Sequence, residues 1–343
     1  MAKIRVGMIR CDLHAIYYAS LIQEHDPYLL REQEYGKGGY FYFYTYYNAP
    51  ARIAFPRVSG FEITKLWDEN RKAAENMSKI YLGKPKLCNS FEEVSDDVDL
   101  VFIPDCNGDG SDHLKLATPG IKKGVPTFID KPFAYEVKDA RELVKLAKKH
   151  KVPIMSLSIL RELPHITRFR HRFAEIGQPE FGIIRAGNME KMSGHIHAIS
   201  LAQHLFGAGV ESVECMGQTP LACVLLDYGT KANRPQKGVI LCCASGGMYH
   251  CSFYASVYSS LGVIHSPQFS DFEFPWGCIK ILKMVKKMVI THKPQVSYEE
   301  MIECIAIVTA ARKAQKLRRK VYLKEVSVIQ TLNKQSRKNK KNR

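Results

Sequence analysis

Hydrophobic and polar positions in the first 160 residues follow a rhythm that predicts strands separated by single helices. Residues 4–9 alternate as a strand, and residues 15–24 form a helix with one apolar face. After a break the rhythm resumes, with strands expected at 61–67, 99–103, 125–128 and 153–159 and helices at 70–80, 112–123 and 138–151. Strands joined by single helices form a parallel, doubly wound sheet. The amino-terminal part is therefore predicted to be an α/β domain.

The pattern changes beyond residue 160, where short strand-like runs are separated by turn residues. These runs are 181–186, 211–216, 222–227, 239–244 and 248–257, and helices are expected at 200–206 and 298–317. Consecutive short strands of this kind are typical of an antiparallel sheet. The second half is predicted to be an α+β domain with a large, mostly antiparallel sheet.

Residues 26–60 interrupt the first pattern and are interpreted as an insertion. They include an aromatic run from Tyr40 to Tyr47, which has strand propensity but no polar face. Something must therefore cover this run. It is either an edge strand packed on the core or a surface on which a sugar ring or an adenine stacks. The expected organisation is a dinucleotide-type domain over 1–133, a second domain over 134–330, in which 134–160 could pack with the first domain, and a basic tail over 331–343.

Composition narrows the class of protein. With 343 residues, 45% of them apolar, the chain is long enough for two domains. It has no apolar run near the ~20 residues that span a bilayer, and nothing that resembles a signal peptide. Its ten cysteines show no Cys-x-x-Cys spacing, and several lie in apolar runs. A reduced, cytoplasmic protein without a metal site is expected.

The net charge of +16 is concentrated at the end of the chain. Residues 312–343 hold thirteen Lys or Arg against one acid, which leaves +4 for the first 311 residues. A basic terminal segment of this kind binds polyanions only weakly and in a salt-dependent way. No specific nucleic-acid partner and no membrane partner is therefore expected.

Lys131 is the first candidate for chemistry, because it follows the short strand that ends near Phe128. In an open parallel sheet, ligands bind beyond the carboxyl ends of the strands, so Lys131 and the preceding Asp130 would face that crevice. The alternative is a solvated lysine in a turn, with Pro132 starting the next helix.

Several motifs along the chain occur in a characteristic order and spacing. They are the strand 4–9; the strand 99–103 followed by Asp112 and His113; Asp130-Lys131-Pro132 where Glu-Lys-Pro is usual; Arg161 to Pro164; Ile196 to Ile199 running into Leu205, Phe206 and Gly207; and the late helix from Ser297 to Leu323. Together they resemble the Gfo/Idh/MocA family of sugar and polyol oxidoreductases over nearly the whole chain.

The resemblance implies an amino-terminal Rossmann domain for a nicotinamide cofactor, and a carboxy-terminal domain that shapes a sugar or polyol site and commonly mediates oligomers. Asp68 at the end of the second strand favours NAD over NADP as that cofactor. It implies that Lys131 lies beside the nicotinamide and the reacting carbon, and that His197 acts as acid or base. Both roles are chemically reasonable, since a neutral imidazole takes a proton near neutral pH and an ammonium stabilises a developing alkoxide. Arg161 and His195 are further candidates for substrate contacts.

The phosphate loop departs from the family pattern. Where G-x-G-x-x-G or G-x-G-x-x-A is usual, the chain has Arg10-Cys11-Asp12-Leu13-His14-Ala15 after Ile9, and only the final small residue is retained. Asp12 adds a side chain and a negative charge where a pyrophosphate would bind, and Arg10 would either pair with Asp12 or hold a phosphate. Asp68, at the end of the second strand, is expected to bind the adenosine ribose or to cap the helix at 70–80.

The catalytic segment departs as well. Ser193 stands where the family usually has an aspartate four residues before the histidine, and Ser200 replaces another commonly acidic position. The alternative for His195 and His197 is that they cap a helix starting near Ala198.

Three functions stay open on this basis. They are an NAD-dependent dehydrogenase of a sugar, polyol or glycoside; a redox-neutral enzyme that uses NAD to cleave a glycoside; and a noncatalytic binding or regulatory subunit. Since the exposed face of a carboxy-terminal sheet is costly to leave in water, a homodimer or homotetramer is expected.

Overall fold

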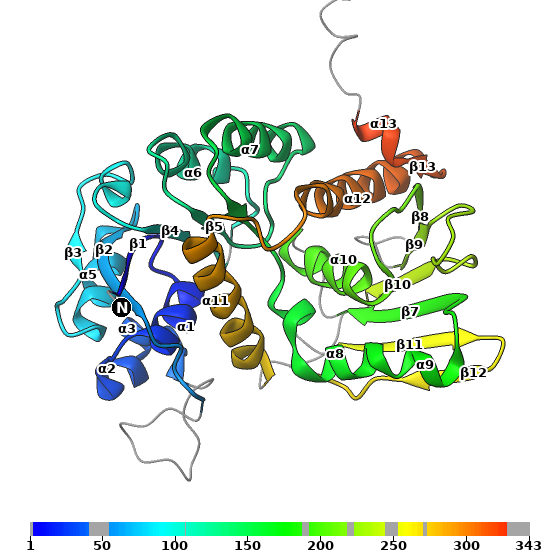
Figure 1. Cartoon of the computed structure of the whole chain (residues 1–343), viewed down its shortest axis with the longest axis horizontal. Helices are drawn as coiled ribbons and strands as arrows, with labels where there is room; N and C mark the ends of the chain where they lie inside the picture. The colour runs from blue at the N-terminus through cyan, green and yellow to red at the C-terminus, as the bar shows by residue number, and fades with distance from the viewer. Residues whose placement is uncertain are drawn as a thin grey trace, which may run out of the picture.

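The computed structural model describes residues 3–40, 55–106, 108–186, 192–217, 223–243, 253–269 and 273–327, and backbone only at 186, 192–194 and 243. Its described part is built on two sheets that lie side by side (Figure 1). This α/β architecture confirms the fold class predicted from the sequence.

The first sheet has six strands, all paired in parallel, in the order β3-β2-β1-β4-β5-β6. The strands are β1 (Ile4–Ile9), β2 (Phe61–Trp67), β3 (Lys86–Leu87), β4 (Leu100–Ile103), β5 (Thr127–Ile129) and β6 (Ile154–Met155). The strand order reverses between β1 and β4, and in sheets of this kind, ligands bind in a crevice at this switch point, beyond the carboxyl ends of the strands. Candidate site residues directly follow β1, β2 and β5.

The helices of this half connect successive strands. They are α1 (Leu13–Ile22), α2 (Pro27–Arg31), α3 (Gln33–Gly36), α5 (Arg71–Ile80), α6 (His113–Lys122) and α7 (Val137–His150), with a 3₁₀ turn η1 at Glu93–Ser95. The first helix begins two residues before the predicted range because the Asp12 side chain caps it, accepting hydrogen bonds from two backbone N–H groups of its first turn.

The strand predicted at 153–159 is shorter in the structure. Only β6 pairs with β5, because the Ser158 side chain accepts a hydrogen bond from the N–H of Leu160 and starts the 3₁₀ turn η2 (Ile159–Glu162). The chain from α7 to β6 therefore packs with the first sheet.

The second sheet has seven strands in the order β12-β11-β7-β10-β9-β8-β13. They are β7 (Phe181–Ala186), β8 (Ser212–Met216), β9 (Cys223–Asp227), β10 (Val239–Cys243), β11 (Tyr254–Ser259), β12 (Gly262–His265) and β13 (Val321–Tyr322). All pairs are antiparallel except β7 with β10. The strand predicted at 248–257 begins only at Tyr254, and 248–252 lie outside the described residues.

Six helices of the described residues belong to the second half: α8 (Pro164–His171), α9 (Phe173–Ile176), α10 (Met192–Phe206), α11 (Phe274–Thr291), α12 (Tyr298–Leu317) and α13 (Leu323–Ser327). Helix α10 begins well before residue 198, so His195 and His197 lie within it, and their interpretation as capping residues is wrong.

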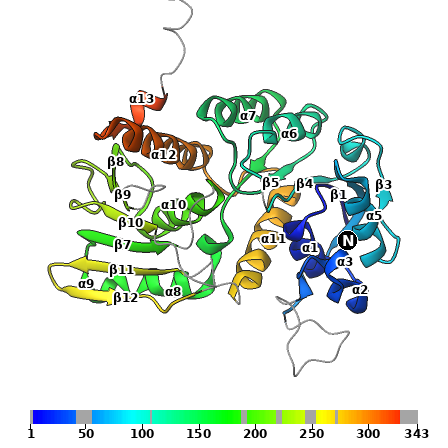
Figure 2. The ribbon, with the colours of Figure 1, turned by 180° about the vertical axis from the view of Figure 1, so that it is seen from behind.

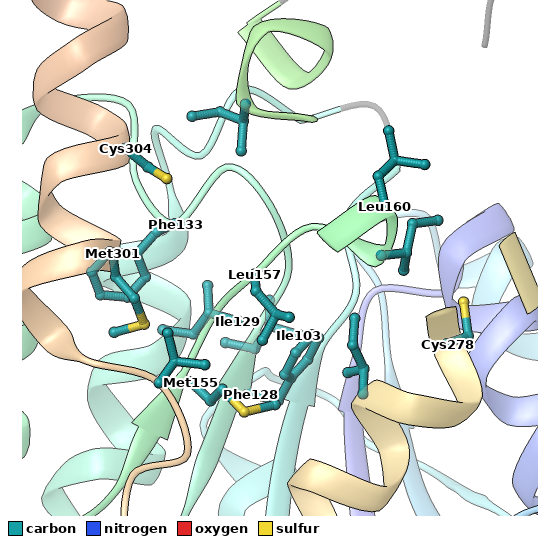
Figure 3. Close-up of a cluster of buried hydrophobic side chains, with 14 of the residues drawn as sticks. Ile103, Phe128, Ile129, Phe133, Met155, Leu157, Leu160, Cys278, Met301 and Cys304 are labelled. Atoms are coloured by element: carbon teal, nitrogen blue, oxygen red, sulfur yellow. The ribbon is translucent and has the colours of Figure 1, made fainter. Parts of the chain in front are cut away.

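Helices α11 and α12 connect the two halves. Both ribbon views place α11 beside α1 (Figures 1 and 2), and Lys286 of α11 donates a hydrogen bond to the carbonyl of Ser59 at 2.9 Å. Figure 3 shows Cys278 of α11 and Met301 and Cys304 of α12 around Phe128 and its neighbours at the ends of β4, β5 and β6. Gly277 permits this packing, since a Cβ there would lie 2.3 Å from the carbonyl oxygen of Ile159.

The insertion contributes α2 and α3. Residues 41–54, which hold most of the aromatic run, lie outside the described residues, as does the tail from residue 328. Among the described residues no helix is long and apolar enough to cross a membrane.

Candidate active site

Lys131 lies in the crevice beyond β5. Its side chain is 4% exposed, and its Nζ lies 3.5 Å from the carbonyl oxygen of Cys106, which follows β4. The alternative of a solvated turn lysine is therefore wrong. The peptide bond between Lys131 and Pro132 is cis, and α7 begins only at Val137, so Pro132 does not start that helix.

Asp130 and His14 form a buried ion pair beside Lys131. The Asp130 carboxylate contacts His14 Nδ1 and accepts hydrogen bonds from the backbone N–H groups of Lys131 and Asp105. Burial alone lowers the pKa of His14, but the Asp130 charge outweighs it and raises the pKa to about 10. Burial likewise raises the pKa of Asp130, but His14 and Lys131 lower it to about 2. Both partners are thus charged near neutral pH.

His197 faces the same region from α10. Its Nδ1 lies 2.6 Å from Ser158 Oγ, which leaves Nε2 for another partner. Burial, then the positive charges of Lys131 and His14, hold the pKa of His197 well below its usual value. A neutral imidazole therefore lies within the electrostatic reach of Lys131. A serine, rather than the carboxylate usual in the family, orients it.

The other two predicted substrate residues are placed differently. His195 is buried, but residues two apart on a helix do not share a face, so it does not lie alongside His197. Arg161 pairs with Glu300 at 2.9 Å and, with Lys131 and Ser158, lines an internal cavity of about 20 Å³. A cavity of this size accommodates a water molecule but no sugar.

The loop after β1 keeps the backbone shape of a glycine-rich loop without its glycines. Arg10 has φ 94°, a conformation that favours glycine, and its N–H donates to the carbonyl of Trp67 at 2.8 Å. Its guanidinium pairs with Asp112 and, at 3.5 Å, with Glu69. No contact joins Arg10 to Asp12 among the described residues, so the predicted pairing of these two is wrong.

The Asp12 carboxylate lies at the amino terminus of α1. Oδ1 accepts hydrogen bonds from the N–H groups of His14 at 2.9 Å and Ala15 at 3.2 Å, and Oδ2 accepts one from Cys106 at 2.5 Å. Burial raises the pKa of Asp12, although the His14 charge and these donors oppose the shift.

Asp68 and Lys37 hold the same loop from its two sides. Asp68 accepts hydrogen bonds from the N–H groups of Cys11 at 2.7 Å and Asn70 at 2.8 Å, and Lys37 donates to the carbonyl of Cys11 at 3.1 Å. Asn70 is the residue that caps α5, so the capping interpretation of Asp68 is wrong. The two apolar candidates for cofactor contact, Ile9 and Leu13, pack in or against the hydrophobic core.

A histidine and two carboxylates gather below this loop. Asp105, Asp112 and His113 bring potential ligand atoms within 4.8 Å of one another. Arg10 pairs with Asp112, and His113 Nε2 lies 3.1 Å from Asp105. These contacts account for the grouping of the three side chains without a bound metal ion.

Sequence reasoning missed two contributors to this site, Ser158 and Cys106. Their signal was topological, because each follows a strand of the parallel sheet at its carboxyl end. Neither is a residue type that draws attention alone, and Cys106 contributes only backbone atoms.

The comparisons with known proteins concern the family and the fold of this chain. Residues 36–157 match the model of the Gfo/Idh/MocA oxidoreductases, described as an oxidoreductase family with an NAD-binding Rossmann fold. This part of the chain is similar to the Gfo/Idh/MocA family. The family predicted from the motifs is thus confirmed, while no curated protein sequence matches the chain.

Solved structures of two dehydrogenases and of an oxidoreductase share the fold over 93–94% of this chain. A scyllo-inositol dehydrogenase from Lactobacillus casei has 10% identity and a TM-score of 0.71, with 98% of its chain covered. A myo-inositol 2-dehydrogenase from Lactobacillus plantarum has 12% identity and a TM-score of 0.70, with 99% covered. An oxidoreductase from Agrobacterium radiobacter, solved with NAD+, L-tartaric acid and magnesium, has 15% identity and a TM-score of 0.67, with 99% covered.

The Gfo/Idh/MocA fold implies a dinucleotide in this crevice, and the residues present fit one end of it but not the other. Lys131 and His197 fit its nicotinamide end, because a cation and a neutral imidazole lie together there. At the pyrophosphate end, the Asp12 carboxylate takes the donors of the first turn of α1, so the residues as placed do not fit a diphosphate.

Proposed function

We propose that this protein is an oxidoreductase that acts on a secondary hydroxyl of a sugar, polyol or glycoside. One observation carries the proposal: Lys131 and the neutral His197 lie within electrostatic reach of each other at the crevice of a Gfo/Idh/MocA fold. Oxidation of an alcohol needs a group that takes the hydroxyl proton and a cation that stabilises the oxyanion. These two side chains provide that pair.

His197 and Lys131 have different roles at the substrate hydroxyl. His197 Nε2 takes the proton, because Nδ1 already faces Ser158 Oγ. The Lys131 ammonium donates a charge-assisted hydrogen bond to the alkoxide that forms. A bound nicotinamide dinucleotide supplies the hydride acceptor, and the buried His14–Asp130 pair fixes the backbone from which Lys131 projects.

NAD is the proposed dinucleotide in preference to NADP. Asp68 stands at the end of β2, where a carboxylate binds a ribose hydroxyl and repels a 2′-phosphate. The inositol dehydrogenases among the structural relatives support a cyclic polyol as the first substrate class to test.

A noncatalytic binding or regulatory role is the second candidate. Asp12 favours it, since its carboxylate lies where the pyrophosphate of a dinucleotide would bind.

A homodimer or homotetramer is proposed with either function, and light scattering of the purified protein measures the oligomeric state.

The test is a panel of inositols, sugars and glycosides, each incubated with NAD or NADP, with absorbance at 340 nm as the readout. We expect NADH formation with at least one polyol and its loss in Lys131→Ala. Lys65→Ala is the matched control, because Lys65 is a half-buried lysine of the same sheet that also binds backbone carbonyls. No turnover with any polyol, by a protein that binds NAD, would favour the noncatalytic role.

A further inference from the structure

The backbone after β1 has the shape of a phosphate-binding turn. Arg10 adopts φ 94°, and α1 begins at Leu13, three residues later. In this fold the amino terminus of the helix after the first strand receives a pyrophosphate through its free N–H groups. The turn is therefore preserved although its glycines are not.

A side chain of the protein itself already satisfies those N–H groups. Asp12 accepts two hydrogen bonds from the first turn of α1, through His14 and Ala15, and a third from Cys106 in the loop after β4. Donors from two loops on either side of the switch point thus converge on one carboxylate. An ordinary helix cap uses only donors of its own helix.

The charges joined to this loop also oppose an added anion. Six acids and four cations are connected to it by direct contacts: Asp12, Asp68, Glu69, Asp105, Asp112 and Asp130 against Arg10, His14, Lys37 and Lys131. Arg10, two residues before Asp12, is engaged by Asp112 and Glu69. A dinucleotide pyrophosphate would add two negative charges to a group that already has an excess of two acids.

We propose that Asp12 is an internal substitute for the pyrophosphate: its carboxylate occupies the phosphate position of the crevice, and a dinucleotide binds only by displacing it. This inference rests on the proposed function, because it names the residue that controls access of the dinucleotide to that site.

Displacement involves the Asp12 side chain rather than the loop. Cys11 is held through its N–H by Asp68 and through its carbonyl by Lys37, so the backbone stays in place. When the carboxylate turns away, the N–H groups of His14 and Ala15 become available to phosphate oxygens. Asp12 therefore weakens NAD and NADP alike, since the pyrophosphate is common to both.

Isothermal titration calorimetry of NAD with the full chain tests this proposal on four proteins. They are the wild type, Asp12→Gly, Asp12→Asn and the control Asp26→Asn. Asp12→Gly removes the side chain and restores the residue usual in a phosphate loop, while Asp12→Asn removes the charge but keeps a capping oxygen and so protects folding. Asp26 caps α2 through the N–H groups of Tyr28 and Leu29 in the same way, away from the crevice.

We expect Asp12→Gly to tighten NAD binding at least tenfold over the wild type, Asp12→Asn to tighten it by less, and Asp26→Asn to leave it unchanged. Wild-type binding in the micromolar range with no gain in Asp12→Gly would overturn this inference while leaving the proposed oxidoreductase intact. If no folded variant binds NAD, then both the inference and the proposed function are wrong. Binding by Asp12→Gly alone supports the inference in its strongest form and favours the noncatalytic role for the wild type.

Discussion

The two ends of the crevice, one after β1 and one after β5, differ in how far they depart from a dinucleotide site. At the β5 end, Lys131 is buried within electrostatic reach of the neutral His197, the pair proposed here for alcohol oxidation. At the β1 end, Asp12 occupies the donors of α1. Both ends belong to one six-stranded parallel sheet. The chemistry of one loop can therefore change while the fold that supports both loops is retained.

Replacing Lys131 with alanine is the change with the largest expected effect. Loss of a charged donor to the developing oxyanion lowers kcat by about 10³-fold. NAD affinity should stay near that of the wild type, because the lysine acts at the reacting end and Asp12 controls the phosphate end. Steady-state kinetics with the active polyol and calorimetry with NAD measure the two effects. A loss of NAD affinity equal to the loss of kcat would show that the two ends are not separable.

Ser158→Ala should have a moderate effect. The substitution leaves His197 Nδ1 without its partner at 2.6 Å, so the ring loses its fixed orientation and kcat falls by about tenfold, with little change in KM. Ser158→Thr keeps a hydroxyl and should restore activity. Ser158→Ala also removes the serine cap of η2. The matched control is therefore Ser297→Ala, which removes the serine cap of α12. If Ser158→Ala lowers the Tm but leaves the pH profile of kcat unchanged, then Ser158 has only a structural role.

The smallest expected effect is on stability, through the His14–Asp130 pair that lies between the two ends. The pKa of His14 is raised to about 10, so its contribution to folding is complete below about pH 6.5 and is lost as the pH rises toward 10. The pKa of Asp130 is lowered to about 2, so its contribution is present above about pH 4 and is lost as the pH falls toward 2. His14→Gln should therefore lower the Tm most between about pH 4 and 6.5, by roughly 2–4 °C.

Thermal unfolding of the wild type and His14→Gln across pH 3–10 measures this difference. His171→Gln, at an exposed histidine at the end of α8, provides the control. A Tm difference that stays constant from pH 6 to pH 10 would contradict the assignment of a charged His14.

Much of the fold was predictable because its strands carry local signals. β2 and α12 have the predicted limits, since an alternating or helical apolar pattern is bounded by turn residues or by a capping serine. Helix α11 was not predicted, because its apolar face is specified by packing on α1 and η2 rather than by clear limits in the sequence. The early start of α10 was missed for a similar reason.

The site was predictable only in outline. The topological rule correctly predicted the place of Lys131, and the unusual Asp12 was visible as a departure. Which groups meet was not predictable, since Arg10 and Asp112 lie far apart in the sequence, as do Ser158 and His197. These residues come together because the ends of neighbouring strands lie side by side and because a helix of the second half packs against them. The hydrophobic pattern of the sequence does not predict such contacts.

Helix α11 has a consequence for how the protein can be divided. Helix α11, far along the chain, packs on α1 of the amino-terminal half and reaches Ser59 through Lys286. A fragment that stops at residue 160 would expose the apolar surface that Cys278 and Ile281 now bury. The packing of the dinucleotide-type half is therefore complete only after α11, at Phe274–Thr291, has been synthesised.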